Sequence, residues 1–170
     1  FIELLKKDRP KKIVDIGANK GAFSKLALEY GVKEVIAIDV DERSLEFLHH
    51  EVKNSNLPIW TAKIDIMIAP EKLGFYNGYV SADKRLNADY GICFAVIHHI
   101  CYFGNYSFDD FAKKIEKYIS KTLIIEFVPY NDKYLTGPIF QGKDRSWYTK
   151  DNFIKSMQVY FKGNCEIYES

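Results

Sequence analysis

Short apolar runs alternate with amphipathic segments along most of this chain of 170 residues. Runs of adjacent apolar side chains predict buried strands at residues 13–16, 34–40, 59–64, 89–97 and 122–128. Between the runs, apolar residues recur every three or four positions, which predicts helices at residues 1–8, 22–30, 42–57, 108–119 and 150–161. Buried strands that alternate with helices are typical of a parallel sheet covered on both faces. We therefore expect an α/β fold with a Rossmann-like, doubly wound, mostly parallel sheet.

Three segments lack a clear hydrophobic period. Residues 67–87 contain Pro70, Gly74 and Gly78, which predicts a loop with a short helix. Residues 131–148 form a long polar and aromatic stretch, and loops of that length often act as functional lids. Residues 166–168 have the composition of the beginning of a sixth strand.

The first predicted strand leads into a turn at residues 15–21 with the sequence D-I-G-A-N-K-G. Gly17 and Gly21 allow the backbone to turn sharply and to approach a ligand closely. Asn19 stands where the dinucleotide fingerprint G-x-G-x-x-G has its middle glycine, which argues against an NAD-dependent oxidoreductase. The chain also has no phosphate-binding P-loop motif. A turn led by the acidic Asp15 suits a ligand with a cationic amino-acid end.

Polar side chains follow each predicted strand. Because ligands bind beyond the carboxyl ends of parallel strands, we expect these residues to converge on one rim of the sheet. Asp39 ends the second strand, where a carboxylate can accept both hydroxyls of a ribose, so it indicates a nucleoside ligand. The other residues at this rim are Asp65, His98, His99, Glu126 and Tyr130.

The acidic residue with glycines two and six positions later resembles the first motif of class I S-adenosylmethionine-dependent methyltransferases. The ordered blocks D-I-G-A-N-K-G, I-A-I-D, A-V-I-H-H-I and I-I-E-F-V-P-x-x-D are similar to a subgroup that includes nodulation-type, host-specificity enzymes. The resemblance covers nearly the whole chain and implies S-adenosylmethionine as cofactor and S-adenosylhomocysteine as product. The cofactor-binding residues that it implies are Asp15, Gly17, Asn19, Gly21, Asp39, Val40, Asp65, Ile66 and Phe94. Asp39 would bind the ribose, Asp65 the adenine amino group, and Val40 and Ile66 the faces of the adenine ring.

The pair His98–His99 follows the fourth predicted strand, where this family places catalytic residues. An imidazole near neutrality is a suitable general base for a hydroxyl or amine nucleophile, and the alternative is a structural role. Glu126 and Tyr130 are candidate substrate contacts, although Glu126 could instead form a buried ion pair with Arg85 or Arg145. We expect no metal site, because no third ligand stands at a suitable spacing from the histidines.

Composition narrows the class of partner. A net charge of +1 argues against a dedicated nucleic-acid binder, although a basic surface of Lys11, Lys12, Lys20 and Lys25 near the site would favour an RNA acceptor. Three scattered cysteines indicate reduced thiols and a cytoplasmic protein, and no apolar run is long enough to span a bilayer. We expect residues 1–170 to form a single domain of a longer polypeptide, because the sequence begins without methionine.

The sequence therefore predicts an S-adenosylmethionine-dependent methyltransferase that acts on oxygen or nitrogen of a small-molecule or carbohydrate-like acceptor. The alternatives are an RNA or protein methyltransferase and a non-catalytic domain with the same fold. The oligomeric state is left open.

Overall fold

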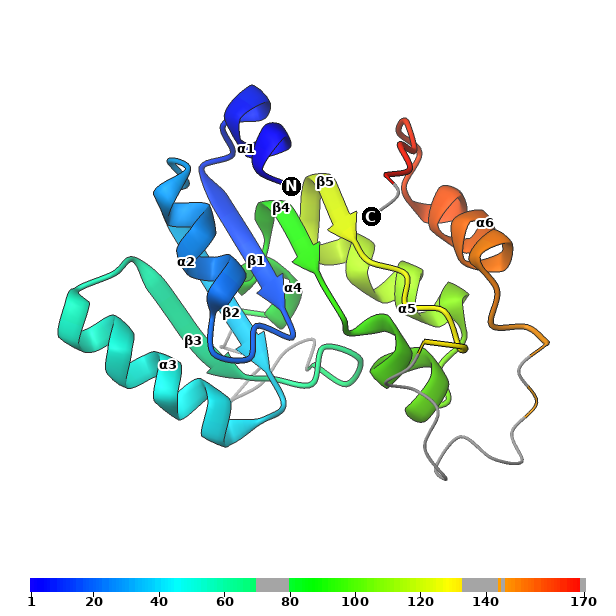
Figure 1. Cartoon of the computed structure of the whole chain (residues 1–170), viewed down its shortest axis with the longest axis horizontal. Helices are drawn as coiled ribbons and strands as arrows, with labels where there is room; N and C mark the ends of the chain where they lie inside the picture. The colour runs from blue at the N-terminus through cyan, green and yellow to red at the C-terminus, as the bar shows by residue number, and fades with distance from the viewer. Residues whose placement is uncertain (70–79, 133–143, 145, 169–170) are drawn as a thin grey trace.

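The computed structural model has a five-stranded sheet at its centre with helices packed against it (Figure 1). The structure describes residues 1–69, 80–132, 144 and 146–168. The strands are β1 (Lys12–Ile16), β2 (Glu34–Asp39), β3 (Ile59–Lys63), β4 (Ala88–Cys93) and β5 (Ile119–Ile125). The helices are α1 (Ile2–Asp8), α2 (Ala22–Glu29), α3 (Glu42–Ser55), α4 (Ala82–Arg85), α5 (Phe108–Ile115) and α6 (Lys150–Tyr160). A π-helix, η2 (His98–Phe103), follows β4, and a 3-10 turn, η3 (Glu116–Tyr118), precedes β5.

All strand pairs of the sheet are parallel, and the spatial order is β3-β2-β1-β4-β5. The chain moves outward from β1 through β2 to β3 and then returns to place β4 on the other side of β1. The carboxyl ends of β1 and β4 therefore flank the point where the strand order reverses, which is the usual ligand site of a doubly wound sheet.

The sheet has a hydrophobic core on each face, because successive side chains of a buried strand point to opposite sides. Ile13 and Val35 belong to one core, together with buried residues of α1, α2 and α3. Val14 and Ile36 belong to the other core, which contains buried residues of α4, α5 and α6. The predicted doubly wound fold with helices on both faces is confirmed.

Polar caps precede the longer helices α3, α5 and α6, which begin at the residues that the sequence pattern predicts. The Asp41 carboxylate accepts from the Arg43 amide at 3.1 Å and begins α3. Ser107 and Asp110 form a reciprocal capping box at α5, in which each side chain accepts from the other residue's amide. Thr149 caps α6 by accepting from the amide of Asn152. These caps satisfy amides that have no partner within the helix.

The bounds of two strands differ from the sequence interpretation, and one predicted strand does not form. Strand β4 ends at Cys93 instead of residue 97, because Ala95 adopts a left-handed conformation with φ of 54° and ends the extended backbone. Strand β5 spans Ile119–Ile125 instead of residues 122–128. Residues 166–168 are not in a strand, and Ile167 is 55% exposed. The short helix expected within residues 67–87 is α4, whereas residues 70–79 lie outside the described part of the chain.

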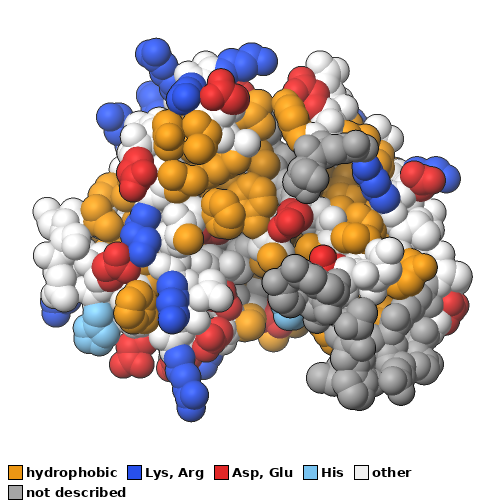
Figure 2. All heavy atoms as spheres, viewed as in Figure 1, with side chains coloured by type: hydrophobic (Ala, Val, Ile, Leu, Met, Phe, Trp, Pro, Cys, Tyr) orange, Lys and Arg blue, Asp and Glu red, His pale blue; other side chains and the backbone are white. Residues whose placement is uncertain are grey.

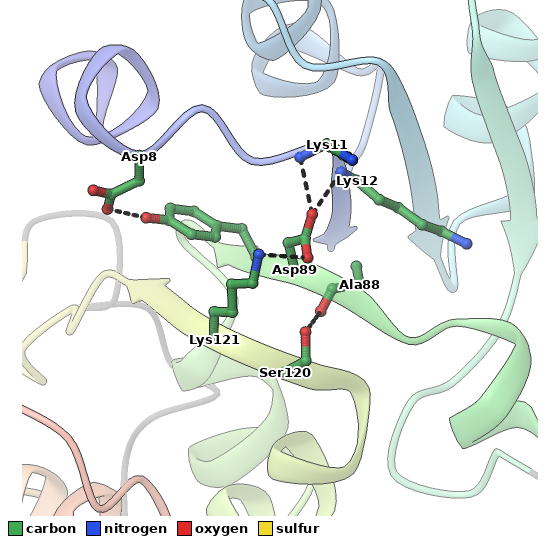
Figure 3. Close-up of polar contacts among 8 residues, drawn as sticks. Asp8, Lys11, Lys12, Ala88, Asp89, Ser120 and Lys121 are labelled. Atoms are coloured by element: carbon green, nitrogen blue, oxygen red, sulfur yellow. Dashed lines mark hydrogen bonds and ion pairs between the residues drawn. The ribbon is translucent and has the colours of Figure 1, made fainter.

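A polar cluster joins the amino ends of three strands (Figure 3). The Asp89 carboxylate accepts from the backbone amides of Lys11 and Lys12 at 2.9 and 3.3 Å. Its other oxygen lies 3.1 Å from Nζ of Lys121. Asp89 on β4 thus ties β1 to β5 at the edge of the sheet opposite the predicted ligand site.

Candidate active site

The turn after β1 is held against the end of β2 by three backbone amides. The amides of Gly17 and Ala18 donate to the carbonyl of Ile38 at 2.9 and 3.0 Å. The amide of Asn19 donates to the Asp39 carboxylate at 2.7 Å. Gly17 has a φ of 76° and Asn19 a φ of 50°, so the turn uses the left-handed region that glycine and asparagine tolerate best.

The same turn touches the loop that follows β4. A Cβ atom built on Gly17 would lie 2.1 Å from Cγ2 of Val96, so a side chain at this position would force Val96 or the turn to move. At Gly21 a Cβ atom would lie 2.5 Å from Cδ1 of Leu48 on α3. Gly17 therefore brings the carboxyl ends of β1 and β4 into contact at the point where the strand order reverses.

Asp15 lies beneath the turn instead of at its surface. The residue is only 3% exposed, and the hydroxyl of Ser24 donates to its carboxylate at 2.5 Å. Burial raises the pKa of Asp15 to about 7, the hydrogen bond from Ser24 opposes this shift, and the charge of Asp39 adds to it. Sequence reasoning missed Ser24, since nine residues separate it from its partner and no motif links them. The predicted contact of Asp15 with a cationic ligand group stays a prediction.

Asp39 lies at the rim with both carboxylate oxygens in hydrogen bonds. One oxygen accepts from Asn19 and the other accepts from the amide of Asp41 at 2.9 Å. The neighbouring Val40 side chain is 62% exposed. An exposed apolar side chain beside a carboxylate offers an apolar surface to the base of a nucleoside and hydrogen-bond acceptors to its ribose.

The residues after β3 divide between the surface and the core. Asp65 is exposed and its carboxylate accepts from the amide of Met67 at 2.9 Å. Ile66 is 3% exposed and packs in the same core cluster as Ile38. Its side chain therefore does not project from the rim, and its contact with an adenine ring remains a prediction.

The two histidines lie on η2 with their rings close together but in different surroundings. His98 is 6% exposed, whereas His99 is exposed, and their ring centroids are 4.1 Å apart. Burial lowers the pKa of His98 to about 4, the neighbouring His99 lowers it further, and Asp132 opposes the shift. Burial also lowers the pKa of His99, while the charge of Asp39 raises it. Nδ1 of His98 is buried and makes no hydrogen bond to any described residue.

Glu126 and Tyr130 follow β5 and are both exposed. The Glu126 carboxylate accepts from the amide of Ala95 at 2.8 Å. It forms no ion pair among the residues that the structure describes, and Arg145 lies outside them. The alternative of a buried ion pair with Arg85 is therefore wrong, and a substrate contact by Glu126 remains a prediction.

Phe94 links the end of β4 to the first turn of α2. Its ring centroid lies 4.4 Å from that of Phe23 and 5.6 Å from that of Phe1. Figure 2 shows hydrophobic side chains gathered near α1 and α2 on the viewed face. Phe94 thus forms an aromatic group with Phe1 and Phe23, and its predicted contact with the cofactor stays a prediction.

The four lysines considered for an RNA surface do not form one patch at the rim. Lys12 pairs with Glu34 at the amino end of β1, and Lys25 pairs with Glu51. Lys20 lies over the ring of Phe47, 5.2 Å from its centroid. A separate cavity of about 580 Å³ lies at the amino ends of the strands, and its lining residues are Lys6, Arg9, Pro10, Lys11, Tyr30, Gly31 and Lys33.

Two negative findings apply to the residues that the structure describes. No three His, Cys, Asp or Glu side chains in residues 1–69, 80–132, 144 and 146–168 come together to hold a metal ion. Over the same ranges, no helix has the length and apolar character that crossing a bilayer requires.

The first 69 residues match a family model described as FtsJ-like methyltransferase. Over 135 residues the chain is 27% identical to the nodulation protein NoeA of Rhizobium meliloti (strain 1021). That match covers 77% of this chain but only 28% of the relative, so the chain spans little more than a quarter of the relative's length.

Solved methyltransferase structures have the same fold. The chain is similar to the methyltransferase domain of bacterial CtHen1, with a TM-score of 0.62, 18% identity and coverage of 94% of this chain and 81% of that one. It is also similar to the bifunctional kinase-methyltransferase WbdD, with a TM-score of 0.58, 17% identity and coverage of 85% and 30%. The strand order and these structural matches agree on the fold of class I S-adenosylmethionine-dependent methyltransferases.

Proposed function

We propose that this protein transfers the methyl group of S-adenosylmethionine to an oxygen or nitrogen of a small-molecule or carbohydrate-like acceptor. The observation that carries the proposal is the meeting of three strand ends at the switch point. The Asn19 amide joins the turn after β1 to Asp39 on β2, and Gly17 contacts Val96 after β4. The π-helix η2, called the histidine helix because it carries His98 and His99, begins directly after this contact.

The residues of the turn and of β2 fit a nucleoside with an amino-acid end. A carboxylate has about four acceptor sites. Asp39 uses two of them for backbone amides, which leaves capacity for ribose hydroxyls. The exposed Val40 offers an apolar surface to one adenine face, and Asp65 offers an acceptor to its amino group. The turn is left-handed at Gly17, Asn19 and Gly21, and its two glycines allow the backbone to approach a ligand closely.

When bound, S-adenosylmethionine supplies a methyl group on a sulfonium, which the acceptor takes by direct displacement. The acceptor atom must be aligned with that methyl group and must lose its proton. His98 is neutral at pH 7 because its pKa is about 4, so its ring can accept a hydrogen bond from the acceptor. Its buried Nδ1 makes no hydrogen bond to a described residue, and an acceptor hydroxyl or amine would provide one. The charge of Asp39 acts on His99, and we propose that His99 helps to orient the acceptor, with Glu126 and Tyr130 as outer contacts.

The state of the thiols supports a proposal for the compartment. Cys93, Cys101 and Cys165 are all unpaired, which supports a reducing compartment, and we propose the cytoplasm.

The cofactor assignment is tested by calorimetric titration with S-adenosylmethionine, S-adenosylhomocysteine and NAD. We expect only the first two to bind. Asp39→Ala should weaken their binding by about 1–3 kcal/mol, because hydrogen bonds to a charged group are lost. The exposed Glu46→Ala on α3 is the matched control and should bind as the wild type does. Binding of NAD alone, or equal affinity of the Asp39 and Glu46 variants, would contradict the assignment.

The histidine assignment is tested by release of S-adenosylhomocysteine with a panel of hydroxyl and amine acceptors. His98→Ala should lower turnover by roughly 10²–10⁴-fold if the residue acts as a general base. His50→Ala changes an exposed histidine on α3 and serves as the control. A fully active His98→Ala enzyme would remove this residue from the mechanism.

A further inference from the structure

The loop between β4 and the histidine helix has a backbone conformation that its sequence does not favour. Ala95 has a φ of 54°, in the left-handed region, although it carries a Cβ atom. Such a residue stays left-handed only where its surroundings hold it there. Glycine, which adopts this region freely, does not occur in residues 94–97.

Glu126 at the end of β5 provides two bonds that hold this loop. Its carboxylate accepts from the Ala95 amide at 2.8 Å, and its own amide donates to the Cys93 carbonyl at 3.0 Å. The first bond is assisted by the carboxylate charge and is therefore stronger than a bond between neutral groups. The second bond fixes the last residue of β4. Together they bracket the point where the chain leaves the sheet.

The loop determines the position of two parts of the proposed active site. Cγ2 of Val96 lies against Gly17, and so the loop forms a wall of the glycine turn. The carbonyl of Val96 accepts from the amides of His99 at 2.9 Å and Ile100 at 3.2 Å, and it thereby begins η2. Single π-turns of this kind occur frequently at functional sites.

We propose that Glu126 is a positioning residue, which holds Ala95 left-handed and so sets both the wall beside Gly17 and the start of the histidine helix. This role differs from the substrate contact expected from its place at the rim. It rests on the proposed function in one respect, namely that the glycine turn binds S-adenosylmethionine.

A double-mutant cycle between Glu126 and Ala95 tests the proposal by calorimetric titration with S-adenosylmethionine. Glu126→Ala should weaken binding about 10-fold or more, because the Ala95 amide loses a charged acceptor. Glu126→Gln keeps an oxygen acceptor and should stay within about 3-fold of the wild type. Ala95→Gly in the Glu126→Ala background should recover most of the lost affinity, because glycine is left-handed at little cost. Glu46→Ala is the control for loss of an exposed carboxylate.

Two outcomes of the titration would overturn the proposal. One is unchanged affinity in the Glu126→Ala variant. The other is a loss that Ala95→Gly does not restore, which would mean that Glu126 acts by its own contact with the ligand.

The wild type, Glu126→Ala, Ala95→Gly and the double variant are also compared by urea denaturation, which does not depend on the ligand. Ala95→Gly should raise the midpoint less in the Glu126→Ala background than in the wild type, because only the wild type holds Ala95 in the strained left-handed conformation. An equal shift in both backgrounds would refute the positioning role. A wild type that does not bind S-adenosylmethionine but shows this coupling would refute the proposed function alone.

Discussion

Replacing Gly17 with alanine tests whether the contact between the glycine turn and the loop after β4 organises the site. The added Cβ atom would lie 2.1 Å from Cγ2 of Val96, whereas ordinary contacts of this kind lie at 3.4–4 Å. The residue also has a φ of 76°, which strains any side chain. Either the turn or Val96 must therefore move.

The cost of Gly17→Ala has two parts. An L-residue in the left-handed region destabilises the folded state by about 1–2 kcal/mol. Alanine also lowers the conformational entropy of the unfolded chain, which offsets about 0.4–1 kcal/mol of this cost. Overpacking against Val96 adds about 1–3 kcal/mol. We expect the free energy of unfolding to fall by about 2–4 kcal/mol.

Gly31→Ala is the matched control, because Gly31 has a φ of 93° but nothing within 4 Å of an added Cβ atom. It reports backbone strain without the overlap and should cost about 1 kcal/mol. Both variants are measured by urea denaturation with linear extrapolation, and their difference isolates the contact with Val96. Gly17→Ala should also weaken binding of S-adenosylmethionine, whereas Gly31→Ala should leave binding unchanged.

The double variant Gly17→Ala/Val96→Ala provides a second check. Val96→Ala removes the atom that the new Cβ would meet, so the double variant should lose less stability than the sum of the single losses. The reasoning is refuted if Gly17→Ala costs no more than Gly31→Ala. The reasoning is also refuted if the double variant loses as much stability as the two single variants together.

Three further predictions concern titration and capping. The folded pKa of Asp15 is raised to about 7, so its contribution to stability is present below about pH 4 and is lost as the pH rises through 7. At pH 8 the free energy of unfolding of Asp15→Asn should therefore exceed that of the wild type by on the order of 2–4 kcal/mol, whereas at pH 4 the two should be equal. If urea denaturation gave the same pH dependence for both proteins, the prediction would be wrong. The folded pKa of His98 is lowered to about 4, so stability falls as the pH drops from about 6.5 toward 4, and an NMR titration midpoint near 6.5 would be inconsistent with its burial. Ser107→Ala removes the capping box of α5 and should cost about 0.5–2 kcal/mol, and an unchanged urea midpoint would count against this role.

The sequence alone was sufficient for the fold class and for the residues at the rim of the sheet. Apolar runs around Val14 and Ile36 predicted buried parallel strands, and the structure places such strands side by side. The spacing of Asp15, Gly17 and Gly21 indicated the family, because a tight turn before a helix requires residues of defined conformation at defined positions. These features depend on neighbours in the sequence, which is why periodicity and motif spacing can reveal them.

Only the tertiary structure decided which rim residues are buried and how they are held. Asp15 and His98 are buried while Asp39 and His99 remain accessible, because their exposure depends on elements far away in the sequence. The left-handed Ala95 ends β4 four residues early, and the acceptor of its amide lies 31 residues further along the chain. Local pattern specifies which elements form, whereas burial, pKa and strained backbone arise from contacts that exist only once the chain has folded.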